Sequence, residues 1–495
     1  MGKMSTAPHR FHTAIHWFRR DLRLHDNPAL HAASRAAECV LPVYVVSAWR
    51  RQHGWTSAVR QEFLCGCLEE LARSLATIGS RLIFRTAERA DEALAALLVE
   101  TGAQAIFFHR DPDPYGIAME EKVAAMARRH GAEAFGYKDT ALHERDELLN
   151  GSDRPYRVYG PYARAWAKLE KPAPVPGIRR LLAPPIDVPS EPAPTLAHWQ
   201  LAPSGADTVA PGERAARARL TRFIEKHLLG YRVAREVPAD EASSRLSQDL
   251  RWGLLSIREV VARCHELLAG EGSAALDATA RESVGKFLGE LAWRDFAMQL
   301  LFHFPEVLAT EFNPAMRGLP WRGWRKNDAA GAADLRRWQA GETGFPLVDA
   351  GLRQLRATGF MHNRVRIVVA MFLTKDLRLH WRAGERFFSQ RLVDGEIANN
   401  NMNWQWCAGT GADAAPYFRI QNPWTQSARH DPHGDYIRRW LPELRDVPAA
   451  KLHAPPAGPR ERLAPNYPLP MVEHGAAREE TLAMFQQHLQ EQRQK

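Results

Sequence analysis

Cysteine is scarce in this sequence, and long apolar runs are missing. The chain of 495 residues has five cysteines, Cys39, Cys65, Cys67, Cys264 and Cys407, an odd number without regular spacing. This argues against a disulfide framework, and Cys65-Gly-Cys67 has no second pair that would complete a zinc site. No apolar run is long enough to span a bilayer, and the N-terminus lacks the order of a secretory signal. We therefore expect structural thiols and a cytoplasmic protein.

A dinucleotide-binding glycine motif is also missing. The first expected strand, residues 14–18, is followed by a polar loop instead of GxGxxG, so a Rossmann-type dinucleotide site is not supported. Strand-like and helix-like segments nevertheless alternate up to about residue 140. The expected strands are 14–18, 40–46, 81–85, 105–108 and 132–137, and the expected helices are 29–38, 58–78, 87–101 and 119–130. This alternation predicts a doubly wound α/β domain with a parallel sheet.

Proline-rich sequence separates this domain from a helical part. Prolines crowd between residues 171 and 212, where they cannot sustain a helix or a central strand. Amphipathic helical patterns follow at 213–229, 257–269, 278–304, 332–340, 345–358, 362–377 and 382–392. We predict an α/β domain over 13–140, an interdomain linker over 141–212, an all-α domain over 213–455 and a short tail over 456–495.

The charge balance indicates the class of partner. A formal net charge of +9 and an isoelectric point near 9.4 favour an anionic partner such as nucleic acid, although a basic balance can also serve solubility alone.

Residues 391–426 have the most unusual composition in the chain. Two carboxylates, Asp394 and Glu396, precede three consecutive asparagines and two tryptophans, Trp404 and Trp406. Buried amides need partners for their donors and acceptors, and the apolar pattern is broken at nearly every position. The stretch is either a polar turn between two helices or the floor of a pocket for a large, flat, polar cofactor.

Other polar groups in the helical part suggest the same kind of pocket. Serines and an arginine at 243–247 form a loop that could wrap phosphate oxygens or simply cap a helix. Glu290, Trp293 and Arg294 fall on one helical face, where Glu290 and Arg294 could also form a plain ion pair. Arginines and an amide at 361–366 suit phosphates or a carboxylate.

Taken together, these motifs resemble the photolyase and cryptochrome flavoproteins, and among them the class I cyclobutane pyrimidine dimer photolyases. The resemblance rests on FRRDLRLHDN at 18–27, SSRLS at 243–247, ELAWRDF at 290–296, GETGFPLVD at 341–349, MHNR at 361–364 and DGEIANN…WQW…PYFRI at 394–420. It covers residues 13 to about 455. It implies FAD bound in the helical domain, an antenna-type α/β domain, and light-driven electron transfer to damaged DNA by a monomer.

The resemblance also assigns roles to single residues. The cofactor-binding residues would be Tyr231, Ser243, Ser244, Leu246, Ser247, Glu290, Arg294, Asn363, Arg366, Asp394, Glu396 and Asn400, with Asn400 facing flavin N5. The substrate-binding residues would be Arg235, Glu290, Trp293, Asn363, Arg364 and Trp406. Glu290 and Asn400 would be catalytic, and Trp404, Trp381 and Trp324 would carry electrons to the flavin, with Trp321 as a competitor for the last position.

Departures from the family pattern concern the flavin surroundings and the antenna. The chain has Ile367, Phe287 and the pair Met402-Asn403 where the family has methionine, tryptophan and two glycines. Gly116 stands where folate-binding relatives have glutamate, which weakens the case for folate. The second chromophore could be a deazaflavin, a flavin or a folate, or there could be none.

Two classes of function follow from the resemblance. Asparagine at position 400 and the absence of a long disordered C-terminal extension favour a DNA-repair lyase over a blue-light receptor that signals through a partner. Asn363 stands where six-four photolyases carry histidine, so the cyclobutane dimer is the preferred lesion and the six-four product the alternative. The dimer would be flipped out of the duplex onto aromatic faces.

Overall fold

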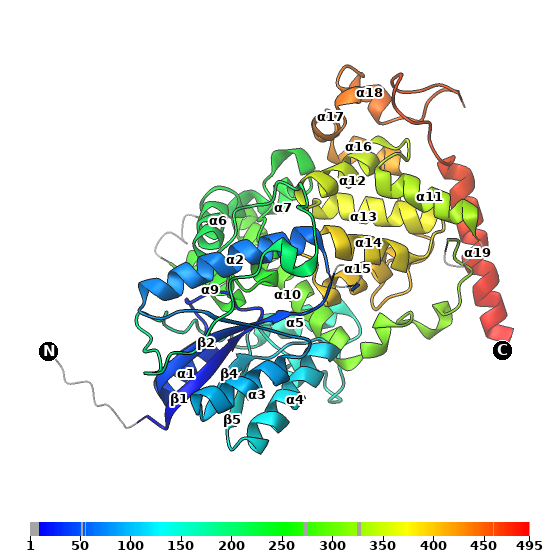
Figure 1. Ribbon diagram of the computed structural model, residues 1–495. Helices are drawn as coiled ribbons and strands as arrows, with labels where there is room; N and C mark the ends of the chain where they lie inside the picture. The colour runs from blue at the N-terminus through cyan, green and yellow to red at the C-terminus, as the bar shows by residue number, and fades with distance from the viewer. Residues whose placement is uncertain are drawn as a thin grey trace.

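The computed structural model describes residues 9–50, 53–54, 56–270, 276–323, 328–458 and 460–494. The N-terminal part is an α/β domain and the remainder is helical, as Figure 1 shows. The fold class predicted from the sequence is therefore confirmed. Within these residues, no helix combines the length and the apolar character that crossing a membrane requires.

One parallel sheet organises the α/β domain. Its strands lie in the order β3-β2-β1-β4-β5, and the order reverses between β1 and β4. The strands are β1 Phe11–Phe18, β2 Ala37–Ser47, β3 Ile83–Ala87, β4 Ala105–His109 and β5 Glu133–Tyr137, and the helices between them are α1 Pro28–Ala36, α2 Ala58–Thr77, α3 Ala90–Thr101 and α4 Pro114–Arg129. Ligands of doubly wound sheets bind beyond the carboxyl ends of the strands at such a reversal, here between β1 and β4.

The two faces of the sheet belong to different hydrophobic cores. On one face, Ile15 packs with Leu94 of α3 and Val123 of α4 in a separate cluster. On the other face, Phe18 belongs to a cluster that includes α1 and α2 and continues to Phe296 in the helical domain. Because neighbouring strand residues point to opposite faces, a continuous apolar strand serves both clusters. The α/β and helical domains therefore share one core.

The remaining helices build the second domain. They are α5 Tyr159–Lys168, α6 Glu213–Lys226, α7 Tyr231–Ala234, α8 Ser247–Arg251, α9 Ile257–Ala269, α10 Ala278–His303, α11 Ala329–Ala340, α12 Pro346–Thr358, α13 Asn363–Met371, α14 Trp381–Arg391, α15 Ile397–Ala408, α16 Pro423–His430, α17 Asp435–Trp440, α18 Ala449–Leu452 and α19 His474–Gln494. A π-helical segment, Phe372–Asp376, continues α13. Each predicted helix of this domain has a counterpart here.

Two segments differ from their sequence-based description. Residues 397–408, expected as a polar turn or the floor of a pocket, form the helix α15, so the polar turn is wrong. Glu396 caps this helix, and its asparagine amides have hydrogen-bond partners. Within residues 141–212, expected as a linker, α5 packs on α10, where Trp166 Nε1 donates to Asp295 Oδ2 at 2.9 Å.

Buried ion pairs join the two domains, and we call this group of four residues the junction. Arg23 Nη2 lies 2.5 Å from Asp139 Oδ1, and Arg258 Nη2 of α9 lies 2.6 Å from the same oxygen. Arg258 also reaches Asp26 Oδ2 at 3.1 Å. All four side chains are at most 4% exposed. The junction ties the β1–α1 loop to a helix of the second domain.

The C-terminal helix α19, red in Figure 1, packs on a third hydrophobic cluster, which lies within the helical domain. Phe485 is fully buried and stacks on Tyr417 at 5.5 Å. At the start of this helix, His474 Nδ1 lies 2.6 Å from Asp376 Oδ1. This helix, as far as Phe485, is thus part of the folded domain.

Candidate functional site

A cavity of about 400 Å³ opens among α7, α8, α10, α13 and α15. We call it the main cavity. Its lining includes most of the residues assigned from the sequence: Tyr231, Arg235, Ser244, Leu246, Ser247, Glu290, Trp293, Arg294, Asn363, Arg364, Arg366, Asp394, Glu396 and Trp406. Ser243 is not among the lining residues. Segments separated by more than a hundred residues of sequence therefore meet at one site.

Helix starts position the acidic and amide groups of this cavity. Glu396 is the N-cap of α15 and accepts from Asn399 N at 2.9 Å, a favourable place for a carboxylate. Asp394 Oδ2, just before it, accepts from Arg366 Nη2 at 2.8 Å. A smaller cavity of about 80 Å³ shares Asp394 and Glu396 and extends to Asn400.

Several buried polar atoms at these cavities have no hydrogen-bond partner among the described residues. They are Arg251 Nη1, Arg364 Nε, Asp394 Oδ1 and Glu396 Oε1. A buried donor or acceptor without a partner is costly, so these atoms indicate a polar ligand. Donors and acceptors occur together with apolar walls such as Phe287 and Leu291. This mixture fits FAD, which has phosphates, hydroxyls and a flat ring with polar edges.

Arg235, Arg364 and Arg366 of the main cavity each pair with a carboxylate. Among the described residues, Arg251 and Arg294 have no carboxylate within hydrogen-bond distance. Burial lowers the pKa of Arg251 to about 9, and the nearby Arg20 adds to this effect. Burial likewise lowers the pKa of Arg294 and that of Arg245 below the ordinary value. Cations that are buried without full compensation are stabilised by an anion. The diphosphate of FAD would supply that negative charge.

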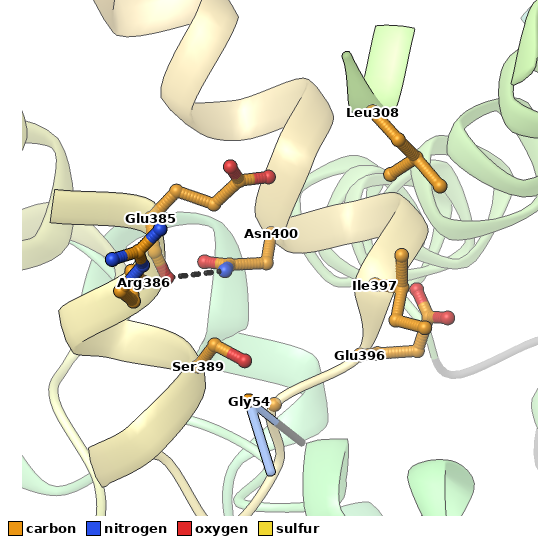
Figure 2. A pocket seen from close by; sticks show the side chains of 9 residues that line it. Gly54, Leu308, Glu385, Arg386, Ser389, Glu396, Ile397 and Asn400 are labelled. Atoms are coloured by element: carbon orange, nitrogen blue, oxygen red, sulfur yellow. Dashed lines mark hydrogen bonds between the residues drawn. The ribbon is translucent and has the colours of Figure 1, made fainter. Parts of the chain in front are cut away.

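Asn400 lies on the wall of a neighbouring cavity of about 290 Å³ (Figure 2). Its Nδ2 donates to the backbone oxygen of Glu385 at 2.9 Å, which leaves its Oδ1 as the acceptor. The Glu385 carboxylate accepts from Asn401 Nδ2 at 2.8 Å. Burial raises the pKa of Glu385 to about 7. The Asn400 amide on α15 therefore lies beside Glu385 on α14, whose pKa is close to neutral pH.

The Glu290–Arg294 ion pair that helical spacing allowed as an alternative gives way to other contacts. The Glu290 carboxylate pairs with Arg235, and Lys286 Nζ lies 3.2 Å from it. Arg294 instead donates to the backbone oxygens of Thr140 and Leu250. Glu290 thus lines the cavity with two cations beside it.

Two of the three tryptophans predicted for the electron route, Trp404 and Trp381, lie among the described residues. Trp404 lines the smaller cavity and packs so close to α14 that a Cβ at Gly384 would lie 2.0 Å from its ring. Trp381 is fully buried, and its Nε1 donates to Glu311 Oε1 at 3.1 Å. Trp321 lies 6.1 Å from the ring of His380. Trp324 lies outside the described residues, so the route from Trp404 through Trp381 stays a prediction.

A separate cavity of about 550 Å³ lies beyond the carboxyl ends of β1, β2 and β4. Aromatic rings and arginines line it, among them Trp17, Tyr44, Trp49, Tyr115, Trp199, Arg19, Arg20 and Arg60. At Gly116 a Cβ would lie 2.3 Å from Asp111 Cβ and 3.1 Å from Arg19 Nη2, so this position has no room for a side chain. The absence of glutamate here therefore has a steric reason.

Sequence reasoning missed two charged residues of the main cavity. Arg251 and Lys286 line it but were not assigned. Both left a signal in helical spacing: Arg251 is four residues after Ser247 on α8, and Lys286 is four residues before Glu290 on α10.

Family models match both parts of the chain. Residues 14–178 match DNA photolyase, and residues 287–487 match the FAD binding domain of DNA photolyase. A curated relative from Agrobacterium fabrum, named deoxyribodipyrimidine photo-lyase, is 38% identical over 97% of this chain and 98% of its own length. Several further curated relatives carry the same name. The resemblance to this family is confirmed, and the chain carries an FAD-binding domain.

Solved structures agree. A class III photolyase from Agrobacterium tumefaciens superposes with a TM-score of 0.87 at 36% identity, covering 98% of this chain and 99% of its own. An archaeal photolyase from Sulfolobus tokodaii, solved with two FAD molecules, gives 0.80 at 28%, covering 96% and 100%. A cryptochrome from Synechocystis gives 0.85 at 28%, covering 97% and 100%.

Proposed function

The chain belongs to the DNA photolyase family, and from this membership we propose that it splits cyclobutane pyrimidine dimers in DNA by light-driven electron transfer from FAD. The observation that carries the proposal is the main cavity, whose lining combines cations suited to a diphosphate with two tryptophans suited to bases. FAD, when bound and reduced, supplies an electron on absorbing blue light.

The residues of the chain would bind and orient the lesion. Trp293 and Trp406 offer aromatic faces for a dimer flipped out of the duplex. Arg235 and Lys286, which hold Glu290 in the free protein, can turn to DNA phosphates and release the carboxylate. Glu290 would then accept a hydrogen bond from the edge of a pyrimidine. Asn400 Oδ1 would accept from the N–H of the reduced flavin ring.

The cavity of the α/β domain would hold a second chromophore. Its place at the strand-order reversal and its aromatic lining suit a flat molecule. The crowding at Gly116 and the similarity to a photolyase solved with two FAD molecules favour a flavin over a folate. On the same family premise we propose that the chain works as a cytoplasmic monomer, with the domain limits given above.

Ultraviolet-irradiated oligothymidine tests the lesion. Reduced protein under blue light should restore the thymine absorbance, whereas a dark control should not. Glu290→Ala should lower the repair yield by about tenfold or more, because a charged hydrogen bond to the reacting base is lost. A light-dependent yield equal to that of the unaltered protein would contradict the role of Glu290.

The similarity to a solved cryptochrome makes a blue-light receptor the second candidate. FAD that binds and is photoreduced without any recovery of thymine absorbance would favour that candidate. Activity confined to six-four products would instead show that the substrate is the six-four product, and the proposal of photorepair would stand.

A further inference from the structure

Trp293 is held by a tyrosine from outside the cavity. The Tyr159 ring stacks on the indole of Trp293 with centroids 3.5 Å apart and planes 10° from parallel. Phe296 meets both rings edge-on at 5.9 Å. Tyr159 covers one face of the indole, so only the other face is available to a base.

Two hydrogen bonds fix Tyr159 itself. Its Oη donates to Gly289 O at 2.6 Å, one turn before Trp293 on α10. Its backbone N donates to Asp413 Oδ2 at 3.1 Å, in the loop that follows α15. Tyr159 therefore connects α10, which carries Trp293, with the end of α15, which carries Trp406.

The helix α5 holds this tyrosine at a fixed place. Tyr162 packs on Phe296 at 5.0 Å, and Trp166 bonds to Asp295, so successive turns of α5 attach to α10. Tyr159 is the first residue of α5, where the chain enters this contact. The ring is thus placed by the packing of a whole helix.

We propose that Tyr159 is a positioning residue for lesion recognition, which sets the plane of the Trp293 indole so that its free face accepts a flipped pyrimidine dimer. This inference rests on the proposed function, because it assigns Trp293 to the lesion. Tyr159 does not line the main cavity and acts through Trp293 alone. A stacked aromatic pair has the strength to favour one ring orientation over others. A free indole would lose orientation freedom on binding, whereas a fixed one has little to lose.

Affinity for damaged and undamaged oligothymidine, measured in the dark, tests the inference. Tyr159→Ala should lower the preference for the dimer by about three- to tenfold, because the orientation supplied by the stack is lost. Affinity for undamaged DNA should stay unchanged. Tyr159→Phe, which keeps the ring and loses only the bond to Gly289, should stay within about twofold.

Tyr156→Ala is the matched control. Tyr156 is also half-buried and contacts Tyr162 edge-on at 5.9 Å on the same segment, so a general disturbance of α5 would appear there too. FAD content verifies that each variant is folded. Equal loss of preference in the Tyr156 and Tyr159 variants would overturn the inference.

A double-mutant cycle separates this inference from the proposed function. In a Trp293→Ala background, Tyr159→Ala should cause no further loss of preference, since the residue it positions is gone. Additive losses would overturn the positioning role. If the unaltered protein shows no preference for dimer-containing DNA, the proposed function itself fails. If it shows a preference that Tyr159→Ala leaves unchanged, only the inference fails.

Discussion

The junction and the main cavity both bury arginines, but they compensate the charge differently. At the junction, burial alone would raise the pKa of Asp139, yet Arg23, His109 and Arg258 hold it below its ordinary value. At the main cavity, burial lowers the pKa of Arg251 and Arg294 because acidic partners are too few. The junction is complete within the chain, and the cavity is complete only with an anionic ligand. The junction stabilises the fold, and the cavity arginines are available to bind the cofactor.

Removing an acid from the junction should have the largest effect. Asp139→Asn leaves Arg23 and Arg258 buried without their shared carboxylate, so the free energy of unfolding should fall by about 3–5 kcal/mol. Urea denaturation of the apoprotein measures it. Arg217→Gln is the control, because Arg217 pairs with Glu259 at 3.0 Å while 41% exposed, and its loss should cost about 1 kcal/mol or less. Equal losses would remove the distinction between the two regions.

Removing a cation from the cavity should act on the ligand instead. Arg251→Met takes away a buried charge whose Nη1 has no partner among the described residues. The dissociation constant of FAD should rise roughly 30-fold, since a charged hydrogen bond is lost, and the apoprotein should be as stable as before or more stable. Fluorescence titration with FAD and urea denaturation measure the two quantities. A destabilised apoprotein would show that Arg251 belongs with the junction arginines.

Glu385 extends the comparison to a buried acid. Only Asn401 bonds its carboxylate among the contacts described, and Arg382 and Arg386 on its own helix lower its pKa less than burial raises it. The folded pKa of about 7 lies above the ordinary value of 4.5, so the folded state holds the proton longer. Stability should therefore fall as the pH rises from about 4.5 to 7 and level off above.

Glu385→Gln should remove that fall, which we expect to be about 2–3 kcal/mol between pH 5 and pH 8. Urea denaturation of both proteins at pH 5 and pH 8 measures it, and the difference between the proteins excludes other titrating groups. The same pH dependence in the variant would show that Glu385 is already compensated.

The fold was largely predictable because its signals are local. Apolar runs and helical periodicity gave the five strands and seven of the longer helices of the second domain to within a few residues, and Ile257–Ala269 has the predicted bounds. The short helices α7, α8, α16, α17 and α18 were not predicted. The helix α15 was not predicted, because its face toward the cavities carries asparagines where a helix of the core would carry apolar residues. The polar residues of α15 line the cavities, so apolar periodicity does not indicate a helix there.

Site residues that belong to family motifs were predictable from the sequence. Site residues defined by tertiary contacts were not. The family motifs contain Glu290, Asn363 and Asp394, all of which line the main cavity. Tyr159 is in none of the motifs used, and its contact with Trp293 spans more than a hundred residues of sequence. Single-sequence spacing has no access to such contacts. Glu290 pairs with Arg235 and not with Arg294 for the same reason, because tertiary packing overrides the i, i+4 spacing on the helix.

The junction also has a consequence in time. Asp139 is 119 residues earlier in the chain than Arg258, and Asp26 is 232 residues earlier. At a synthesis rate of 5–20 residues per second, Arg258 is synthesised roughly 6–24 s after Asp139. The sheet can assemble during that interval, because one face of it has a cluster of its own. Its other face and its acids are completed only when α9 emerges, so the nascent α/β domain exposes apolar surface until then.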